Sequence, residues 1–412
     1  SSMQTGTNGT SYYFSVASGD ITNFFNEVDL NTPWDYHYEN LDSRTILDRL
    51  AAVKYFVVKA GEEEYLPYGY DTLAAEAEKK DRLYRAYECK NALPIGYTYD
   101  SYIPEKKYAK MSTVEKQQAL LQGVVLADSA VPETTPEFND REVSYKLVTG
   151  SGCKEKDGKL IITKENAQAK LVFDGLDECE TYLITEGVDY EALSPRELIS
   201  DKKWNKMTLY EQKKVQYENS KWRYWKESQK AYIDVTGQFL DKTISIFTDK
   251  YNAYSGRSDF LCNTGYSEKG KKSITLTFEN TGVYSYKDMK VVCQPMKNIE
   301  SQTSRLGTES LKDVKIKNHE LTGSISVSKD KVLVISLPYS KGFQAYVDGQ
   351  KTELKQANTM YMALELTKGD HEIRITYYTP YLKTGLVLTC VGILCYICVV
   401  LVCKKRRGNK ET

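Results

Sequence analysis

The chain has 412 residues, with 56 basic and 56 acidic side chains, so its formal net charge is zero and its sequence pI is about 6.8. This balance supplies no global positive field, which excludes a nucleic-acid-binding protein that relies on overall charge. The length is enough for two or three domains with their own cores. Tyrosine is frequent, at 33 residues against 11 phenylalanines, which suits partly solvent-exposed sheet faces or stacking on sugars.

Residues 1–130 mix helical and extended periodicity. The stretch TILDRLAAVKYFVV changes from helical spacing at Ile46, Leu47 and Leu50 to a continuous apolar run that ends at Val58. The stretch EKQQALLQGVVL repeats this order. We therefore expect an α+β unit, which ends at the acidic stretch VPETTPEFNDRE because its prolines continue neither a helix nor a strand.

Residues 131–308 predict an antiparallel, jelly-roll-like β-sandwich. Short β-branched runs are closed by Gly, Asn or Asp, namely DGKLIITKEN, AKLVFDGL, ETYLITEG, KTISIFTD and KSITLTFENTG. A helical insertion at about 194–232 interrupts them. Two capping boxes, SPRE from Ser194 and TLYE from Thr208, predict two helices there.

The insertion is basic and rich in tryptophan. Residues 201–230 hold nine Lys or Arg against four acids, together with three of the four tryptophans, Trp204, Trp222 and Trp225. Basic side chains interleaved with Trp suit a helix at the headgroup interface of a membrane. The alternative is an amphipathic helix that packs its tryptophans on the sandwich.

Residues 309–380 predict a small, membrane-proximal β-sandwich of hairpins. Three turn signals mark it: Lys329-Asp330, the type I′ pair Asp348-Gly349, and Gly369-Asp370. The complete chain is therefore expected to be α+β and mainly β, with one helix at its C-terminus.

Residues 381–403 predict a transmembrane helix. No charged side chain occurs from Thr384 to Cys403, and this length as a helix matches the hydrocarbon core of a bilayer. Basic residues gather in the tail, 404–412, so the tail is expected in the cytoplasm and the bulk outside. The opening stretch has no export signal, so we expect upstream segments to deliver the bulk; a tail-anchored protein with a cytosolic bulk is the alternative.

The sequence offers no convincing active site. Its three histidines, His37, His319 and His371, have neither a metal-ligand spacing nor a nucleophile motif beside them. The glycine turns are hairpin turns rather than phosphate-binding loops, and the five cysteines outside the apolar helix form no Cys-x-x-Cys pair. We therefore assign no catalytic residue, no metal site and no cofactor to this chain.

Several stretches resemble the C-terminal half of the YfhO family of bacterial membrane proteins. They are LDRLAAVKYFVVK, NALPIGYTYDSYI with QQALLQGVVL, DFLCNTGY, GVYSYKDMKVVCQPM and the long block LPYSKGFQAYVDGQKTELKQANTMYMALELTKGDHEIRITYYTPYLKTG. The similarity runs in order from about Leu41 to the end of the chain and includes the final helix.

The resemblance implies a polytopic, GT-C-like glycosyltransferase. Such a protein takes a sugar from a polyprenyl-phosphate donor outside the cell and adds it to a cell-envelope polymer such as lipoteichoic acid. The catalytic half would lie upstream, in a transmembrane bundle, so no catalytic residue carries over. We expect this chain to cap that site and to position the polymeric acceptor, with Tyr97, Tyr99 and Tyr102 as candidate contacts. The alternative for at least one of these tyrosines is a place in the sandwich core.

Two other interpretations stay open at the sequence level. The first is a surface module that binds glycans or proteins, is held by one helix and has no catalytic activity. The second is a scaffold or transport accessory with an inert cap. The location that all of these share is the bacterial cell membrane, with the lipid bilayer as a partner.

Overall fold

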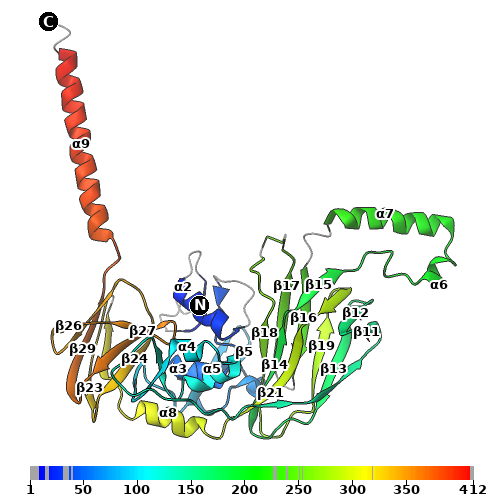
Figure 1. Ribbon diagram of the computed structural model, residues 1–412, viewed down its shortest axis with the longest axis horizontal. Coiled ribbons are helices and arrows are strands. Elements are labelled where there is room, and N and C mark those ends of the chain that lie inside the picture. The colour runs from blue at the N-terminus through cyan, green and yellow to red at the C-terminus, as the bar shows by residue number, and fades with distance from the viewer. Residues whose placement is uncertain are drawn as a thin grey trace.

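The computed structural model describes residues 9–13, 18–30, 37–38, 40–225, 230–237, 240–249, 251–252, 254–317 and 319–408. The fold is mostly β, with several antiparallel sheets and one apolar helix at the C-terminus, as the sequence predicts. In Figure 1, a small sandwich and a larger sandwich flank a set of helices from the N-terminal part of the chain. The C-terminal helix leaves the small sandwich and points away from the body.

The N-terminal unit combines short helices with small sheets. Its helices are α2 (Gly19–Glu27), α3 (Thr45–Leu50), η1 (Glu63–Tyr65), α4 (Glu105–Tyr108) and α5 (Thr113–Ala119). Its strands are β1 (Tyr12–Tyr13), β2 (His37–Tyr38), β3 (Tyr55–Lys59), β4 (Tyr70–Lys79), β5 (Arg82–Cys89), β7 (Tyr102–Pro104) and β8 (Val124–Leu126). The predicted helix-to-strand order is confirmed twice, in α3 followed by β3 and in α5 followed by β8.

The larger sandwich consists of three antiparallel sheets around one apolar core. The first contains β10 (Tyr145–Thr149), β13 (Ala167–Phe173), β19 (Ser273–Phe278), β16 (Lys230–Thr236) and β17 (Asp241–Phe247). The second contains β11 (Cys153–Lys156), β12 (Lys159–Ile162), β20 (Gly282–Ser285) and β15 (Asp189–Ala192). The third contains β18 (Phe260–Ser267), β14 (Cys179–Glu186), β21 (Asp288–Pro295) and β9 (Arg141–Val143).

The third sheet is covered on both faces. Because side chains alternate along a strand, Leu183 of β14 points into the sandwich core while Tyr182 and Ile184 point to the other side. There they meet Val114 of α5 in a second apolar cluster. The N-terminal unit therefore packs directly on the outer face of this sheet.

The insertion forms an arm of two helices, α6 (Asp201–Trp204) and α7 (Leu209–Trp225). The capping box at Thr208 is present, since Glu211 accepts from the Thr208 backbone N–H at 2.7 Å. The box at Ser194 also forms, with Glu197, but the residues after it make only a turn. The first helix instead begins after Ser200, whose hydroxyl accepts from the Lys203 N–H.

The small sandwich is made of two antiparallel sheets. One contains β22 (Lys312–Lys317), β23 (Glu320–Val327), β29 (Gly369–Tyr377), β25 (Phe343–Val347) and β26 (Gln350–Thr352). The other contains β27 (Lys355–Ala357), β28 (Tyr361–Leu366), β24 (Lys331–Pro338) and β6 (Gly96–Tyr99). The hairpin at Asp348-Gly349 is confirmed: Val347 pairs with Gln350, and both turn residues have positive φ, as a type I′ turn requires.

The other two predicted hairpins are wrong. At Lys329-Asp330 the chain passes from β23 in one sheet to β24 in the opposite sheet. Gly369 and Asp370 are the first two residues of β29, and residues 367–368 before them join β28 to β29, again from one sheet to the other. A turn signal shows where a strand ends but not which strand it pairs with next. Each of these segments therefore joins two layers of the small sandwich.

The predicted division at 130 and 308 stays a prediction, but the units share elements. Strand β6, from the N-terminal segment, pairs with β24 of the small sandwich. Along β24, Leu333 and Ile335 fill the small sandwich, while Val332 and Val334 belong to the core of the N-terminal unit. Helix α8 (Ile299–Gly307), which lies within the predicted sandwich segment, packs into that same N-terminal core.

Helix α9 (Leu382–Gly408) follows the small sandwich after only residues 378–381. Its span Leu382–Cys403 is long and apolar enough to cross a membrane, and no part of that span is buried inside the protein. The predicted transmembrane helix of residues 381–403 is therefore present as one isolated helix. The side chains of residues 404–412, the predicted cytoplasmic tail, lie outside the described part of the structure.

Candidate functional site

The tyrosines predicted to contact a substrate lie mainly in the core. Tyr97 and Tyr99 share one face of β6, as predicted, with ring centroids 5.7 Å apart, but that face packs on the N-terminal core. Their hydroxyl groups donate to the carbonyl oxygens of Leu50, at 3.0 Å, and Leu120, at 2.6 Å. Burial raises the pKa of both hydroxyls. Neither ring is available for stacking on a sugar, because both side chains are at most 1 % exposed.

Tyr102 differs from the other two tyrosines. It begins β7, which pairs in parallel with β8, and its side chain is half-buried against the edge of the same core. The alternation of the sequence shows which side chains share a face of a strand, but the covering of that face by α3 and α5 depends on distant residues.

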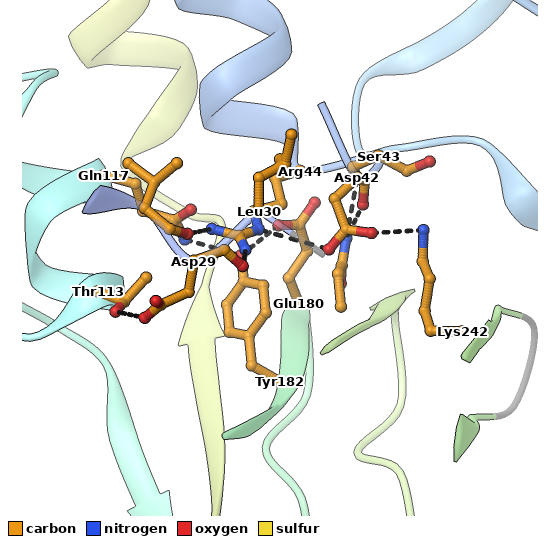
Figure 2. Close-up of polar contacts among 12 residues, drawn as sticks. Asp29, Leu30, Asp42, Ser43, Arg44, Thr113, Gln117, Glu180, Tyr182 and Lys242 are labelled. Atoms are coloured by element: carbon orange, nitrogen blue, oxygen red, sulfur yellow. Dashed lines mark hydrogen bonds and ion pairs between the residues drawn. The ribbon is translucent and has the colours of Figure 1, made fainter. Parts of the chain in front are cut away.

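A buried polar cluster joins the N-terminal unit to the larger sandwich (Figure 2). Arg44, just before α3, is completely buried and donates to the carbonyl oxygens of Val28, at 2.6 Å, and Asp29, at 2.9 Å. Its charge is matched by Asp42, whose carboxylate lies 3.6 Å from the Arg44 Nε. Lys242 of the sandwich lies 2.7 Å from the other oxygen of Asp42.

Glu180 of β14 is a further charged member of this cluster. One carboxylate oxygen accepts from the backbone N–H of Thr45, at 3.1 Å, and from the Thr45 hydroxyl, at 2.5 Å. The other accepts from the Tyr182 hydroxyl, at 2.5 Å, and Gln117 of α5 donates to that hydroxyl at 2.9 Å. Burial raises the pKa of the Glu180 carboxyl, and these hydrogen bonds oppose the rise.

Helix α3 also carries two fully buried charged side chains, Asp48 and Arg49. Arg49 donates to Glu300, at 2.5 Å, and to Thr303, at 3.1 Å, and so connects α3 to α8. One carboxyl oxygen of Asp48 has no hydrogen-bond partner. Burial, followed by the nearby Glu180 and Asp42 carboxylates, raises the pKa of Asp48 well above its ordinary value.

The polar cluster is suited to holding the N-terminal unit and the larger sandwich together rather than to chemistry on a substrate. Its charged groups are enclosed, and its hydrogen bonds run from α3 and α5 to the third sheet of the sandwich. A general acid or base has to reach the substrate proton, and these side chains contact only other parts of the protein. Within the described residues, no three His, Cys, Asp or Glu side chains gather closely enough to hold a metal ion.

None of the residues in this cluster is among the site residues predicted from the sequence. A signal is present in the stretch LDSRTILDRL, where Asp42 and Arg44 come just before the predicted helix and Asp48 and Arg49 lie among its apolar residues. Charged side chains on every side of such a helix cannot all face water if the helix is in a core. Glu180, which accepts from Thr45, and Glu300, which accepts from Arg49, are more than a hundred residues away in the sequence, and no local pattern indicates them.

The tryptophans predicted to lie at a membrane interface are on the arm. Trp204 is half-buried under Arg196, whose guanidinium carbon lies 4.4 Å from the ring centroid. Trp222 is half-buried against the core of the larger sandwich. Trp225 ends α7, and its side chain lies outside the described residues. Trp222 thus packs on the sandwich, as the alternative from sequence states, whereas Trp204 packs under Arg196 on the arm itself. Contact of these tryptophans with a membrane interface stays a prediction.

The fold and the isolated apolar helix indicate a membrane protein with one large, mainly β body. The family model described as "Bacterial membrane protein YfhO" matches residues 1–389. The chain therefore belongs to the YfhO family of bacterial membrane proteins.

A relative and two solved structures show similarity to the chain. YfhO of Bacillus subtilis (strain 168), described as an uncharacterized protein, is 22 % identical over 415 residues, which cover 98 % of this chain and 42 % of the relative. The chain thus spans less than half the length of that relative.

Two cryo-EM structures of the mycobacterial arabinofuranosyltransferase AftD are similar at 13 % and 10 % identity, each with a TM-score of 0.16. They cover 41 % and 37 % of this chain and 14 % and 13 % of theirs. Scores this low carry no argument about the fold.

Proposed function

We propose that this chain is the extracytoplasmic portion of a YfhO-family membrane glycosyltransferase of the GT-C type. In this proposal the chain caps a membrane-level active site formed by a transmembrane bundle of the same protein. The sugar comes from a polyprenyl-phosphate donor, and the acceptor is a cell-envelope glycopolymer of the lipoteichoic acid type. The bulk lies outside the cell, and the basic tail lies in the cytoplasm.

The observation that carries the proposal is the membership of the YfhO family together with the short connection between the small sandwich and α9. Only residues 378–381 separate β29 from the apolar span. A body attached this closely stays at the membrane surface, where a lipid-linked donor has its phosphate. Positioning of a polymer beside that donor lowers the barrier, because orientation supplies part of the activation free energy.

The buried polar cluster supports a role of this chain in positioning the acceptor polymer. Glu180 binds the start of α3 to the third sheet of the sandwich, and Arg49 binds α3 to α8. Arg44 binds the same segment to the end of α2. Strand β6 fixes the N-terminal unit to the small sandwich. A polymer bound on the larger sandwich would therefore be held at a set position relative to α9 and the membrane.

The test removes the larger sandwich from a full-length family member. Its two ends lie side by side, since Arg141 of β9 pairs with Cys293 of β21, so a short Gly/Ser loop can replace residues 141–295. We expect sugar transfer to the polymer to be lost while binding of the polyprenyl-phosphate donor is kept. Unchanged transfer by this variant would refute the acceptor-positioning role.

Two further measurements check the location and the enzyme class. Protease added to intact cells should digest the body and leave a tag on the 404–412 tail intact; the opposite pattern reverses the proposed sidedness. Loss of the gene should remove a sugar from the envelope polymer. If the polymer keeps all of its sugars, the alternative of a non-catalytic surface module that binds glycans or proteins is favoured.

A further inference from the structure

Helix α7 has one side that packs within the protein. Asn219 accepts from the Arg196 backbone N–H at 3.2 Å, and Gln212 donates to the carbonyl oxygen of Trp204 at 3.0 Å. The segment from Arg196 to Trp204 therefore covers the side of α7 that includes Gln212 and Asn219. At the end of the helix, Trp222 packs against the core of the larger sandwich and anchors the arm there.

The opposite side of α7 carries a regular set of exposed tyrosines and lysines. The spacing i, i+3, i+4, i+7 and i+11 places five residues on one helical face, which we call the Tyr/Lys face: Tyr210, Lys213, Lys214, Tyr217 and Lys221. All five are exposed, and the two tyrosines are 79 % and 59 % accessible. The Lys221 ammonium lies 4.3 Å from the Tyr217 ring centroid, so cation and ring already form one surface.

The acidic residues of α7 leave this face positively charged. Glu211 is engaged in the capping box with Thr208. Glu218 lies four residues after Lys214 and three before Lys221, so it borders the Tyr/Lys face on one side. The face therefore presents three cations and two interfacial aromatic rings with one carboxylate, Glu218, at its border, and its net charge is positive.

Helix α9 shows where a bilayer would lie relative to this face. In Figure 1, α9 points away from the body on the same side as α7, and α7 runs across the direction of α9 near the level at which α9 begins. A helix that lies parallel to a membrane surface has this relation to a helix that crosses it. The segment leading to α6, which contacts the side of α7 that holds Gln212 and Asn219, passes below α7 in this view. The opposite side, which is the Tyr/Lys face, would therefore be nearer to a bilayer that α9 enters.

We propose that the Tyr/Lys face of α7 is a second membrane contact, which binds the anionic headgroups of the leaflet that α9 enters. Tyrosine is favoured at headgroup level, and lysines near an anionic surface are attracted to it. Each lysine contributes roughly fivefold to the affinity for such a surface, so three contribute on the order of a hundredfold. Because α9 holds the chain at the bilayer, this modest attraction acts at high effective concentration and fixes the tilt of the larger sandwich.

This contact involves residues other than the predicted tryptophans. Trp204 and Trp222 lie on the covered side, while Tyr210 and Tyr217 take the outward positions. The proposal depends on α9 crossing a membrane but not on the glycosyltransferase activity. It holds for either direction of insertion.

The test measures lysine accessibility in the complete chain, inserted through α9 into lipid nanodiscs. Acetylation of Lys213, Lys214 and Lys221 is compared between discs of phosphatidylcholine alone and discs with about a third phosphatidylglycerol. We expect at least a tenfold lower acetylation rate in the anionic discs, reversed at about 1 M salt, where the Debye length is about 3 Å. Exposed Lys297, beside α8 at the far side of the body, is the internal control and should not change.

Two variants separate charge from folding. The readout is amide hydrogen exchange of α7, which we expect to be slower in anionic discs than in detergent for the wild type. Replacement of the three lysines by Arg should keep this slow exchange in anionic discs. Replacement by Glu should abolish it without changing the exchange of α7 in detergent. Equal acetylation in both kinds of disc overturns the proposal. Protection by soluble polyphosphate in detergent, without protection in anionic discs, also overturns it and assigns the face to an anionic polymer.

Discussion

The hydrogen bonds of Glu180 in the buried polar cluster allow a quantitative prediction. In Glu180→Ala, three buried donors lose their acceptor: the Thr45 N–H, the Thr45 hydroxyl and the Tyr182 hydroxyl. Each unsatisfied buried donor costs roughly 1–3 kcal/mol. The Tyr182 hydroxyl can turn to Gln294, whose side-chain oxygen is 3.5 Å away, which lowers the total. We expect Glu180→Ala to reduce the free energy of unfolding by about 4 kcal/mol.

Glu180→Gln is the matched control. Its amide oxygen can still accept from Thr45, and its amide group can donate to the Tyr182 oxygen, so we expect a loss of only about 1 kcal/mol. The assay is guanidinium unfolding of the complete chain in detergent, followed by tyrosine and tryptophan fluorescence. Equal midpoints for the wild type and Glu180→Ala would show that the buried cluster does not join the two bodies energetically.

Three further predictions concern other parts of the fold. Asp48→Asn should stabilise the protein increasingly as pH rises from 4 to 8. Burial first, and then nearby carboxylates, raise the pKa of Asp48, so ionisation of this carboxyl above its unfolded pKa destabilises the wild type. A gain in the free energy of unfolding that is equal at pH 3.5 and pH 8 refutes this. Gly270→Ala should cost about 1–3 kcal/mol, since a Cβ there would lie against the Gly175 carbonyl oxygen, whereas Gly19→Ala, with open space around it, should be neutral in the same unfolding assay. Leu394→Arg, near the centre of the apolar span, should reduce membrane insertion by about 3 kcal/mol in a microsomal insertion assay, and undiminished insertion would argue against a spanning helix.

Local patterns were sufficient for several elements. Fewer than two dozen consecutive residues are enough to predict each of three features: the apolar span of α9, the type I′ pair at Asp348-Gly349 and the capping box at Thr208. Each depends on chemistry between near neighbours: transfer of a helix into lipid, positive φ in a two-residue turn, and a side chain that accepts from an orphan N–H. The YfhO resemblance was also readable, because it rests on ordered motifs.

The pairing between strands could not be predicted from the local sequence in the same way. The stretch around Lys329-Asp330 has the composition of a hairpin turn, yet β23 and β24 join different sheets. The deciding factor is that each strand finds an apolar surface to cover: Leu333 and Ile335 face one core, and Val332 and Val334 face another. A strand with two buried faces reads as one continuous apolar run, which carries no information about its neighbours.

The sequence by itself determined the mainly β composition, the membrane-length helix and the family, because these follow from short-range periodicity, hydropathy and ordered motifs. Only the tertiary structure decided that Tyr97 and Tyr99 are core residues, that Arg44 and Glu180 belong to one buried cluster, and that α7 lies on the same side of the body as α9. These features depend on contacts between residues far apart in the chain. Their formation is governed by which surfaces exclude water together, and a local pattern does not encode that.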